Sequence, residues 1–201
     1  MIIQRYFPAV VMADLLPNIN TNQLEEYAYH LKDTDSGRTV TNYGGWQSKD
    51  LDQNNDILKP LVDEIYKHVV AMHELHSIKK ELDPIIDNIW ININSKGGFN
   101  RPHLHNDDLF SGVFYVKTPE HSGNIVFTHP AQQQQYHFTT TPQIVEEWTD
   151  TNSGMMYQYA QPGKIVMFPS WLLHYVEPNL SDQDRISIAF NTKLIKKEHT
   201  L

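Results

Sequence analysis

Hydrophobic residues recur at helical spacing in the first part of the chain. Between residues 21 and 31 they return every three or four positions, which predicts an amphipathic helix with Asn20 or Thr21 as its N-cap. A longer apolar stripe predicts a second helix from residue 54 to about residue 76. Residues 33–52, which separate the two helices, are rich in Gly, Ser, Asn and Asp and predict a loop.

After Pro84 the pattern changes to short β-branched and aromatic runs, several of which alternate between polar and apolar positions. Turn signals such as Lys96-Gly97-Gly98 separate these runs. Many short strands at this spacing predict a mainly β sandwich or barrel, with jelly rolls and cupins among the options. The runs cover residues 89–94, 112–117, 124–127, 155–159, 164–168 and 185–190.

Length, charge and cysteine content narrow the possible functions. The 201 residues suffice for one domain with a sizeable core. The net charge of −8 argues against non-specific binding to nucleic acid or anionic lipid. No apolar run approaches the ~20 residues of a membrane span, and the start lacks a secretory signal, so we expect a cytoplasmic protein. The absence of cysteine leaves His, Asp and Glu as the residues that can hold a metal.

A pair of histidines follows the first β run. In an extended segment residues i and i+2 point to the same side, so His103 and His105 would present two imidazoles to one point. His105 and Asp107 stand in the same relation. Imidazole suits iron and several other transition metals, and two histidines with one carboxylate form the facial triad of non-haem Fe(II) oxygenases. This segment is therefore a candidate metal site.

Two features nearer the C-terminus fit such a site. His174 is a single histidine that could come from a strand across the barrel. Arg185 and Ser187 share one face of a predicted strand. A guanidinium binds a carboxylate through two hydrogen bonds and the neighbouring hydroxyl adds another, so the pair could anchor the far end of a dicarboxylate such as 2-oxoglutarate.

Taken together, these stretches resemble the 2-oxoglutarate-Fe(II) oxygenase superfamily, and within it a group found in bacteria and marine phages. The resemblance covers roughly residues 89–192, about half of the chain. The matching stretches are Trp90-Ile91-Asn92, Gly97 to His105, Ser111 to Val116, Pro119, Ser122-Gly123, Ile125-Val126-Phe127, Phe168 to Val176 and Arg185 to Asn191.

The resemblance implies a double-stranded β-helix (jelly-roll, cupin-like) core over residues 89–192, supported by helices in residues 1–88, in a single domain over 1–201. It also implies Fe(II) and 2-oxoglutarate as cofactors, and hydroxylation of a substrate with release of succinate and CO2. By position, His103 and His174 match the superfamily's two histidine ligands. Arg185 and Ser187 match the residues that grip 2-oxoglutarate.

One residue departs from the superfamily pattern, because His105 stands where an aspartate is usual. In one interpretation His105 is itself a ligand and the site has three histidines. In the other the register shifts, and His105 with Asp107 rebuilds the usual motif. We favour the first, since the glycines before the motif fix the register. Tyr115 could hydrogen-bond 2-oxoglutarate or simply pack in the core, and Asn92, Asn124 and Asn191 could line the pocket.

Two other functions are compatible with this histidine set. One is a cupin-like enzyme that uses its metal without oxidation, and the other is a metal-binding module that has lost chemistry. Neither needs the dicarboxylate anchor that Arg185 and Ser187 provide. We expect a small-molecule or peptide substrate, no membrane partner and no nucleic acid. The sequence does not identify the substrate or the oligomeric state.

Overall fold

The computed structural model describes residues 1–4, 7–131 and 136–197. The chain is mainly β, with 36% of it in strands against 20% in helices, which confirms the predicted class. The strands are β1 (Met12–Leu15), β2 (Asn42–Gln47), β3 (Leu82–His103), β4 (Phe110–Lys117), β5 (Ile125–Thr128), β6 (Met155–Gln158), β7 (Lys164–Pro169), β8 (His174–Val176) and β9 (Arg185–Lys196). The helices are α1 (Thr21–Thr34), α2 (Lys59–Leu75), the short α3 (Tyr136–Thr140) and the 3₁₀ turn η2 (Pro142–Ile144).

Both predicted helices are present. The side chain of Asn20 accepts a hydrogen bond from the backbone N–H of Gln23, so Asn20 is the N-cap of α1. Helix α2 begins at Lys59, five residues later than predicted. The carboxylate of Asp52 and the amide oxygen of Asn55 accept backbone N–H groups two residues further on. These local bonds compete with helix formation and delay its start.

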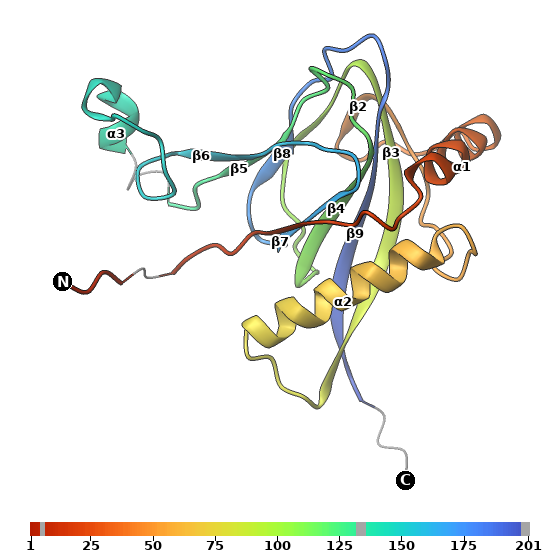
Figure 1. The fold of residues 1–201 in the computed structure, drawn as a ribbon, viewed down its shortest axis with the longest axis horizontal. Helices are drawn as coiled ribbons and strands as arrows, with labels where there is room; N and C mark the ends of the chain where they lie inside the picture. Colours follow the sequence, from red (N-terminus) through yellow and green to blue (C-terminus); the bar gives the residue numbers. More distant parts are fainter. Residues whose placement is uncertain (5–6, 132–135, 198–201) are drawn as a thin grey trace.

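The strands form one antiparallel sheet in the order β1-β7-β4-β9-β3-β8-β5-β6, with β2 paired to β3. Strand β3 is long enough to belong to both halves of the sheet. Its first part pairs with β9, as in Asn92 opposite Ser187, and its end pairs with β8, as in His103 opposite His174. Because one strand joins both halves, the sheet curls into a half-barrel (Figure 1).

The predicted turn at Lys96-Gly97-Gly98 is wrong, because these residues lie within β3. Gly97 has φ 80°, and its N–H donates to the carbonyl of Asn179 at 2.7 Å. This irregularity bends β3 without ending it. The predicted loop over residues 33–52 is wrong in part, since it contains β2. A Cβ on Gly98 would lie 2.9 Å from the carbonyl oxygen of Gly44 in β2, so glycine allows the two strands to approach.

Alternation along the strands divides the buried side chains between two layers. The main core lies between the outer face of the sheet and α2, which crosses that face in Figure 1. In β7, Ile165 and Met167 join this core, whereas Val166 and Phe168 point into the half-barrel. The same alternation in β9 turns Arg185 and Ser187 toward the interior, where a cavity lies. The fold thus collects polar residues of several strands inside the curl.

Candidate metal centre

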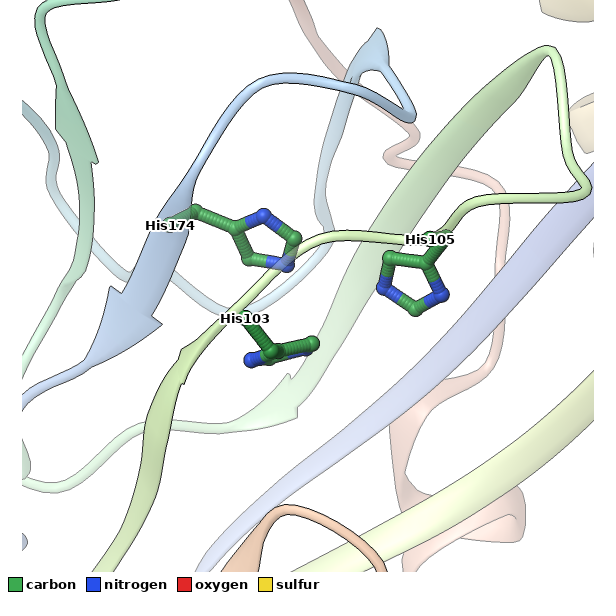
Figure 2. A group of neighbouring side chains, drawn as sticks. All are labelled: His103, His105 and His174. Carbon is green, nitrogen blue, oxygen red and sulfur yellow. The ribbon is translucent and has the colours of Figure 1, made fainter.

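Three imidazole rings converge at one end of the half-barrel. His103 ends β3 and His174 begins β8, and the two are cross-strand partners. His105 lies two residues beyond β3, in the loop that leads to β4. The ring centroids are 4.3 Å apart for His103 and His174, 5.1 Å for His103 and His105, and 5.5 Å for His105 and His174. One nitrogen from each ring lies within 4.8 Å of the others, so the three could hold one metal ion. Figure 2 shows the three rings gathered in one place.

Backbone carbonyls fix two of these rings. Nδ1 of His103 donates to the carbonyl of Arg101 at 2.6 Å, and Nδ1 of His174 donates to that of Leu172 at 2.8 Å. A carbonyl oxygen only accepts, so Nδ1 carries the proton in both rings and the lone pair of a neutral ring is on Nε2. This is the usual way in which proteins orient a histidine toward a metal.

The electrostatic surroundings keep all three rings neutral. Burial, and to a lesser degree the neighbouring His103, lower the pKa of His174 to about 3 and that of His105 to about 4. Burial likewise lowers the pKa of His103, although its bond to Arg101 opposes the shift. A metal ligand must be deprotonated, so these rings are available to a metal at neutral pH.

The carboxylates after His105 stand apart from the rings. Asp107 is exposed in the turn that follows and is not among the residues whose ligand atoms converge. Asp108 is half-buried, and burial raises the pKa of its carboxyl group, although Lys193 opposes the shift. Within the described residues the converging group therefore consists of three histidines.

Deeper in the curl lies a second polar group, formed by Arg185, Ser187 and Tyr115. Ser187 and Tyr115 are cross-strand partners on β9 and β4, and Arg185 precedes Ser187 by two residues on the same face. All three are buried, Arg185 with 1% of its surface exposed. The strands therefore place these sequence-predicted residues together, beside the histidines and facing the same cavity.

Two donors in this group are buried without a hydrogen-bond partner in the described part of the chain. Nη1 of Arg185 donates to the carbonyls of Ser122 and Glu177, but its Nη2 has no acceptor. Burial lowers the pKa of Arg185 to about 10, so it remains charged at neutral pH. The Tyr115 hydroxyl also lacks a well-aligned partner. Burial, opposed in part by nearby Arg185 and the backbone of Ile125, raises its pKa to about 12. Buried donors without acceptors are costly, so this pair fits an anionic ligand such as a carboxylate.

A cavity of about 60 Å³ connects the histidines to Arg185. Asn92 and Asn191 line it, as the sequence suggested. Asn124 does not, because its amide binds Glu177 and the backbone of Ala160. Several other residues that line the cavity carry no site signal in the sequence. No local signal identified them, because each resembles an ordinary strand or loop position: Thr41, Trp90, Asn100, Ser111, Val113 and Ala189.

Comparison with known proteins identifies the family. The model described as "Putative 2OG-Fe(II) oxygenase" matches residues 88–191, more than half of the chain. The chain belongs to the 2OG-Fe(II) oxygenase family. The expected enzyme class, an oxidoreductase dependent on 2-oxoglutarate, is confirmed, as is the expected cofactor pair of Fe(II) and 2-oxoglutarate. No curated protein matches the oxygenase by sequence.

Solved structures resemble the oxygenase over nearly its whole length. A Pseudomonas putida prolyl-4-hydroxylase has a TM-score of 0.61 at 13% identity, covering 94% of this chain and 93% of its own. HygX from Streptomyces hygroscopicus, with nickel and 2-oxoglutarate bound, has a TM-score of 0.60 at 11% identity, and the match covers 90% of this chain and 82% of HygX. The viral collagen prolyl hydroxylase of Paramecium Bursaria Chlorella virus-1, in its 2-oxoglutarate complex, has a TM-score of 0.58 at 11% identity. The match covers 90% of this chain and 94% of the viral enzyme. These similarities confirm the predicted double-stranded β-helix core. Among the described residues, no helix is both long and apolar enough to cross a bilayer.

Proposed function

We propose that this oxygenase binds Fe(II) through His103, His105 and His174 and uses O2 to hydroxylate a substrate while 2-oxoglutarate is converted to succinate and CO2. One oxygen atom of O2 enters the substrate hydroxyl and the other enters succinate. One observation carries the proposal. A single cavity joins three neutral, convergent imidazoles to a buried arginine that has an unused donor. The histidines suit the metal, and the arginine suits the distal carboxylate of a dicarboxylate.

The protein's part in this reaction is to bind and orient. When bound, Fe(II) and 2-oxoglutarate would activate O2, which is the oxidant of the reaction. Arg185 would hold a carboxylate of 2-oxoglutarate through its unpaired Nη2, and the hydroxyls of Tyr115 and Ser187 would add hydrogen bonds to it. Because Nη1 of Arg185 is already held by the carbonyls of Ser122 and Glu177, the guanidinium is oriented before the ligand arrives.

The third ligand is His105 in this proposal, and Asp107 lies outside the site. The support is positional, since Asp107 is exposed while the His105 ring stacks at 5° to the ring of His174. Three imidazoles give the metal a ligand set one negative charge short of the two-histidine, one-carboxylate arrangement. His105→Ala should weaken Fe(II) binding strongly, whereas Asp107→Ala should leave it within about twofold of the parent. The reverse ranking would favour the shifted register.

The substrate is proposed to be a small molecule or a peptide whose reacting portion is uncharged. Apart from Arg185, which the proposal assigns to 2-oxoglutarate, the described residues that line the cavity carry no formal charge at neutral pH. Trp90, whose ring centroid lies 6.3 Å from that of His105, offers an apolar surface beside the metal position.

The decisive experiment is an anaerobic titration of the metal-free enzyme with Fe(II) and then 2-oxoglutarate. The chelate should produce a visible charge-transfer band, and succinate should form when oxygen is admitted. Arg185→Ala should weaken 2-oxoglutarate binding by about 10-fold or more, because a hydrogen bond to a charged group contributes about 1.5–3 kcal/mol.

Arg101→Ala is the matched control, because Arg101 is an exposed arginine whose side chain bonds Val40 and does not line the cavity. This variant should retain the parent's 2-oxoglutarate affinity. Two results together would instead favour a cupin-like non-oxidative enzyme or a metal-binding module. The enzyme would bind Fe(II) without forming the charge-transfer band, and Arg185→Ala and Arg101→Ala would have the same affinity for 2-oxoglutarate.

A further inference from the structure

A buried chain of hydrogen bonds begins next to the metal centre. The hydroxyls of Ser170 and Ser111 are 2.9 Å apart, and Ser111 donates to Oδ1 of Asn191 at 2.7 Å. Nδ2 of Asn191 in turn donates to Oδ1 of Asn88 at 3.1 Å. Because the Ser111 proton is committed to Asn191, the Ser170 hydroxyl must be the donor to Ser111. The chain therefore has one direction, from Ser170 outward to Asn88.

Ser170 connects this chain to the backbone of His105. It is completely buried in the turn after β7. Its N–H donates to the carbonyl of Leu109 at 3.1 Å, and its own carbonyl accepts the N–H of His105 at 2.9 Å. Ser170 thus has its N–H, carbonyl and hydroxyl all engaged, and two of these bonds go to Leu109 and Ser111 at the start of β4.

His105 depends on this connection more than the other two histidines do. His103 and His174 belong to strands, and each has its Nδ1 held by a carbonyl. His105 lies in a loop, next to the partly exposed Leu104, and its ring makes no hydrogen bond within the described residues. Its backbone bond to Ser170 is therefore the main polar restraint on where this ring sits.

We propose that Ser111 is a positioning residue for the third metal ligand and acts through Ser170. This inference rests on the proposed function, in which His105 binds the metal. Without the Ser111 hydroxyl, the turn that carries the Ser170 carbonyl loses its side-chain hydrogen bond to β4 and can shift. Since that carbonyl holds His105, the third ligand is displaced while His103 and His174 keep their own restraints.

The first measurement is the Fe(II) affinity of the metal-free enzyme under anaerobic conditions. Ser111→Ala should bind Fe(II) about 10- to 100-fold more weakly, the usual effect of removing a residue that supports a metal ligand. Ser170→Ala removes the partner hydroxyl and should show a similar loss, which provides a second variant if the first folds poorly. Ser111→Thr keeps a hydroxyl and should recover most of the affinity.

Thr192→Val is the matched control. Thr192 is a fully buried hydroxyl on β9 that bonds the N–H and carbonyl of Phe110, each at 3.2 Å. It lies at the same end of the β4–β9 pair as Ser111, but it does not line the cavity. Thr192→Val should lower the midpoint of thermal unfolding about as much as Ser111→Ala does, and it should leave the Fe(II) affinity unchanged. If Ser111→Ala loses no more affinity than Thr192→Val, the positioning role is wrong.

A double-mutant cycle with His105 separates this inference from the proposed function. In the His105→Ala background, adding Ser111→Ala should change Fe(II) affinity by less than about twofold, because the ligand that Ser111 positions is already gone. An undiminished loss in that background would overturn the positioning role while leaving His105 as a ligand. If His105→Ala alone binds Fe(II) like the parent, both the ligand assignment and the positioning role fail.

Discussion

The Tyr115 hydroxyl is buried without a well-aligned hydrogen-bond partner in the described part of the chain, so its removal distinguishes a ligand-binding role from a structural one. An unsatisfied buried polar group costs about 1–3 kcal/mol. Tyr115→Phe removes that cost and keeps the ring. We therefore expect the free energy of unfolding of the enzyme without metal and 2-oxoglutarate to rise by about 1 kcal/mol. A buried tyrosine with a well-formed hydrogen bond would show a loss of about the same size.

The same substitution should weaken 2-oxoglutarate binding. The hydroxyl would donate to a carboxylate held by Arg185, and a hydrogen bond to a charged group contributes about 1.5–3 kcal/mol. This corresponds to a Kd about 10- to 150-fold higher. Urea denaturation measures the stability, and anaerobic titration of the Fe(II) enzyme with 2-oxoglutarate measures the affinity.

Tyr29→Phe is the control for this prediction, because the Tyr29 hydroxyl has a partner, Asp184, at 3.3 Å and lies outside the cavity. It should slightly lower stability and leave 2-oxoglutarate affinity unchanged. The reasoning would be refuted if Tyr115→Phe lowered stability and bound 2-oxoglutarate like the parent. That result would mean that the hydroxyl is held by the nearby backbone of Ile125 and has a structural role.

Two further predictions concern the folded state. The metal-free enzyme should lose stability below pH 6.5, because burial lowers the pKa of His105 to about 4 and of His174 to about 3, so the unfolded chain takes up protons first. Between pH 6.5 and its folded pKa, each ring makes the free energy of unfolding fall by up to about 1.4 kcal/mol per pH unit. Urea denaturation at pH 7 and pH 5 measures this fall, and a His105→Leu variant that loses as much stability as the parent would contradict the prediction. Gly112→Ala should lower the free energy of unfolding by about 1–3 kcal/mol, since its Cβ would lie 2.2 Å from Cζ of Phe190. Adding Phe190→Leu should recover much of that loss in thermal or urea unfolding, and strictly additive losses would show that the two residues do not collide.

Local patterns in the sequence were sufficient for much of the fold. The helical stripe of α1 and its cap at Asn20 depend on residues a few positions apart, and so do the alternating runs of β4, β7 and β9. The His103, His174 and Arg185 set was recognisable because each residue type carries a specific chemistry and because the set occurs in a recognisable order. The family match over residues 88–191 falls on the same segment.

Where neighbours in space decide the structure, the sequence prediction was wrong. The sequence predicts a loop where β2 lies, because Gly44 and Gly45 break the local pattern. Only the neighbouring strand β3 explains them, since Gly44 lies against Gly98, and a Cβ on Gly45 would lie 2.9 Å from the carbonyl oxygen of Ile93. The sequence likewise predicts a turn at Gly97 and Gly98, although β3 continues through them. Its second half finds a new partner in β8, and no local signal encodes that pairing.

For the candidate metal centre, the sequence determined which residues could take part, and the tertiary structure decided how they meet. It left His105 and Asp107 as rivals, because both continue the same two-residue spacing. The curl of the sheet brings the His105 ring against His174 and leaves Asp107 exposed. The hydrogen bonds that connect Ser111 to Ser170 and Ser170 to His105 join residues that are far apart in the sequence; Ser170 and His105 are 65 positions apart. Such a link depends on which strands pair and how the sheet closes, so only the folded chain reveals it.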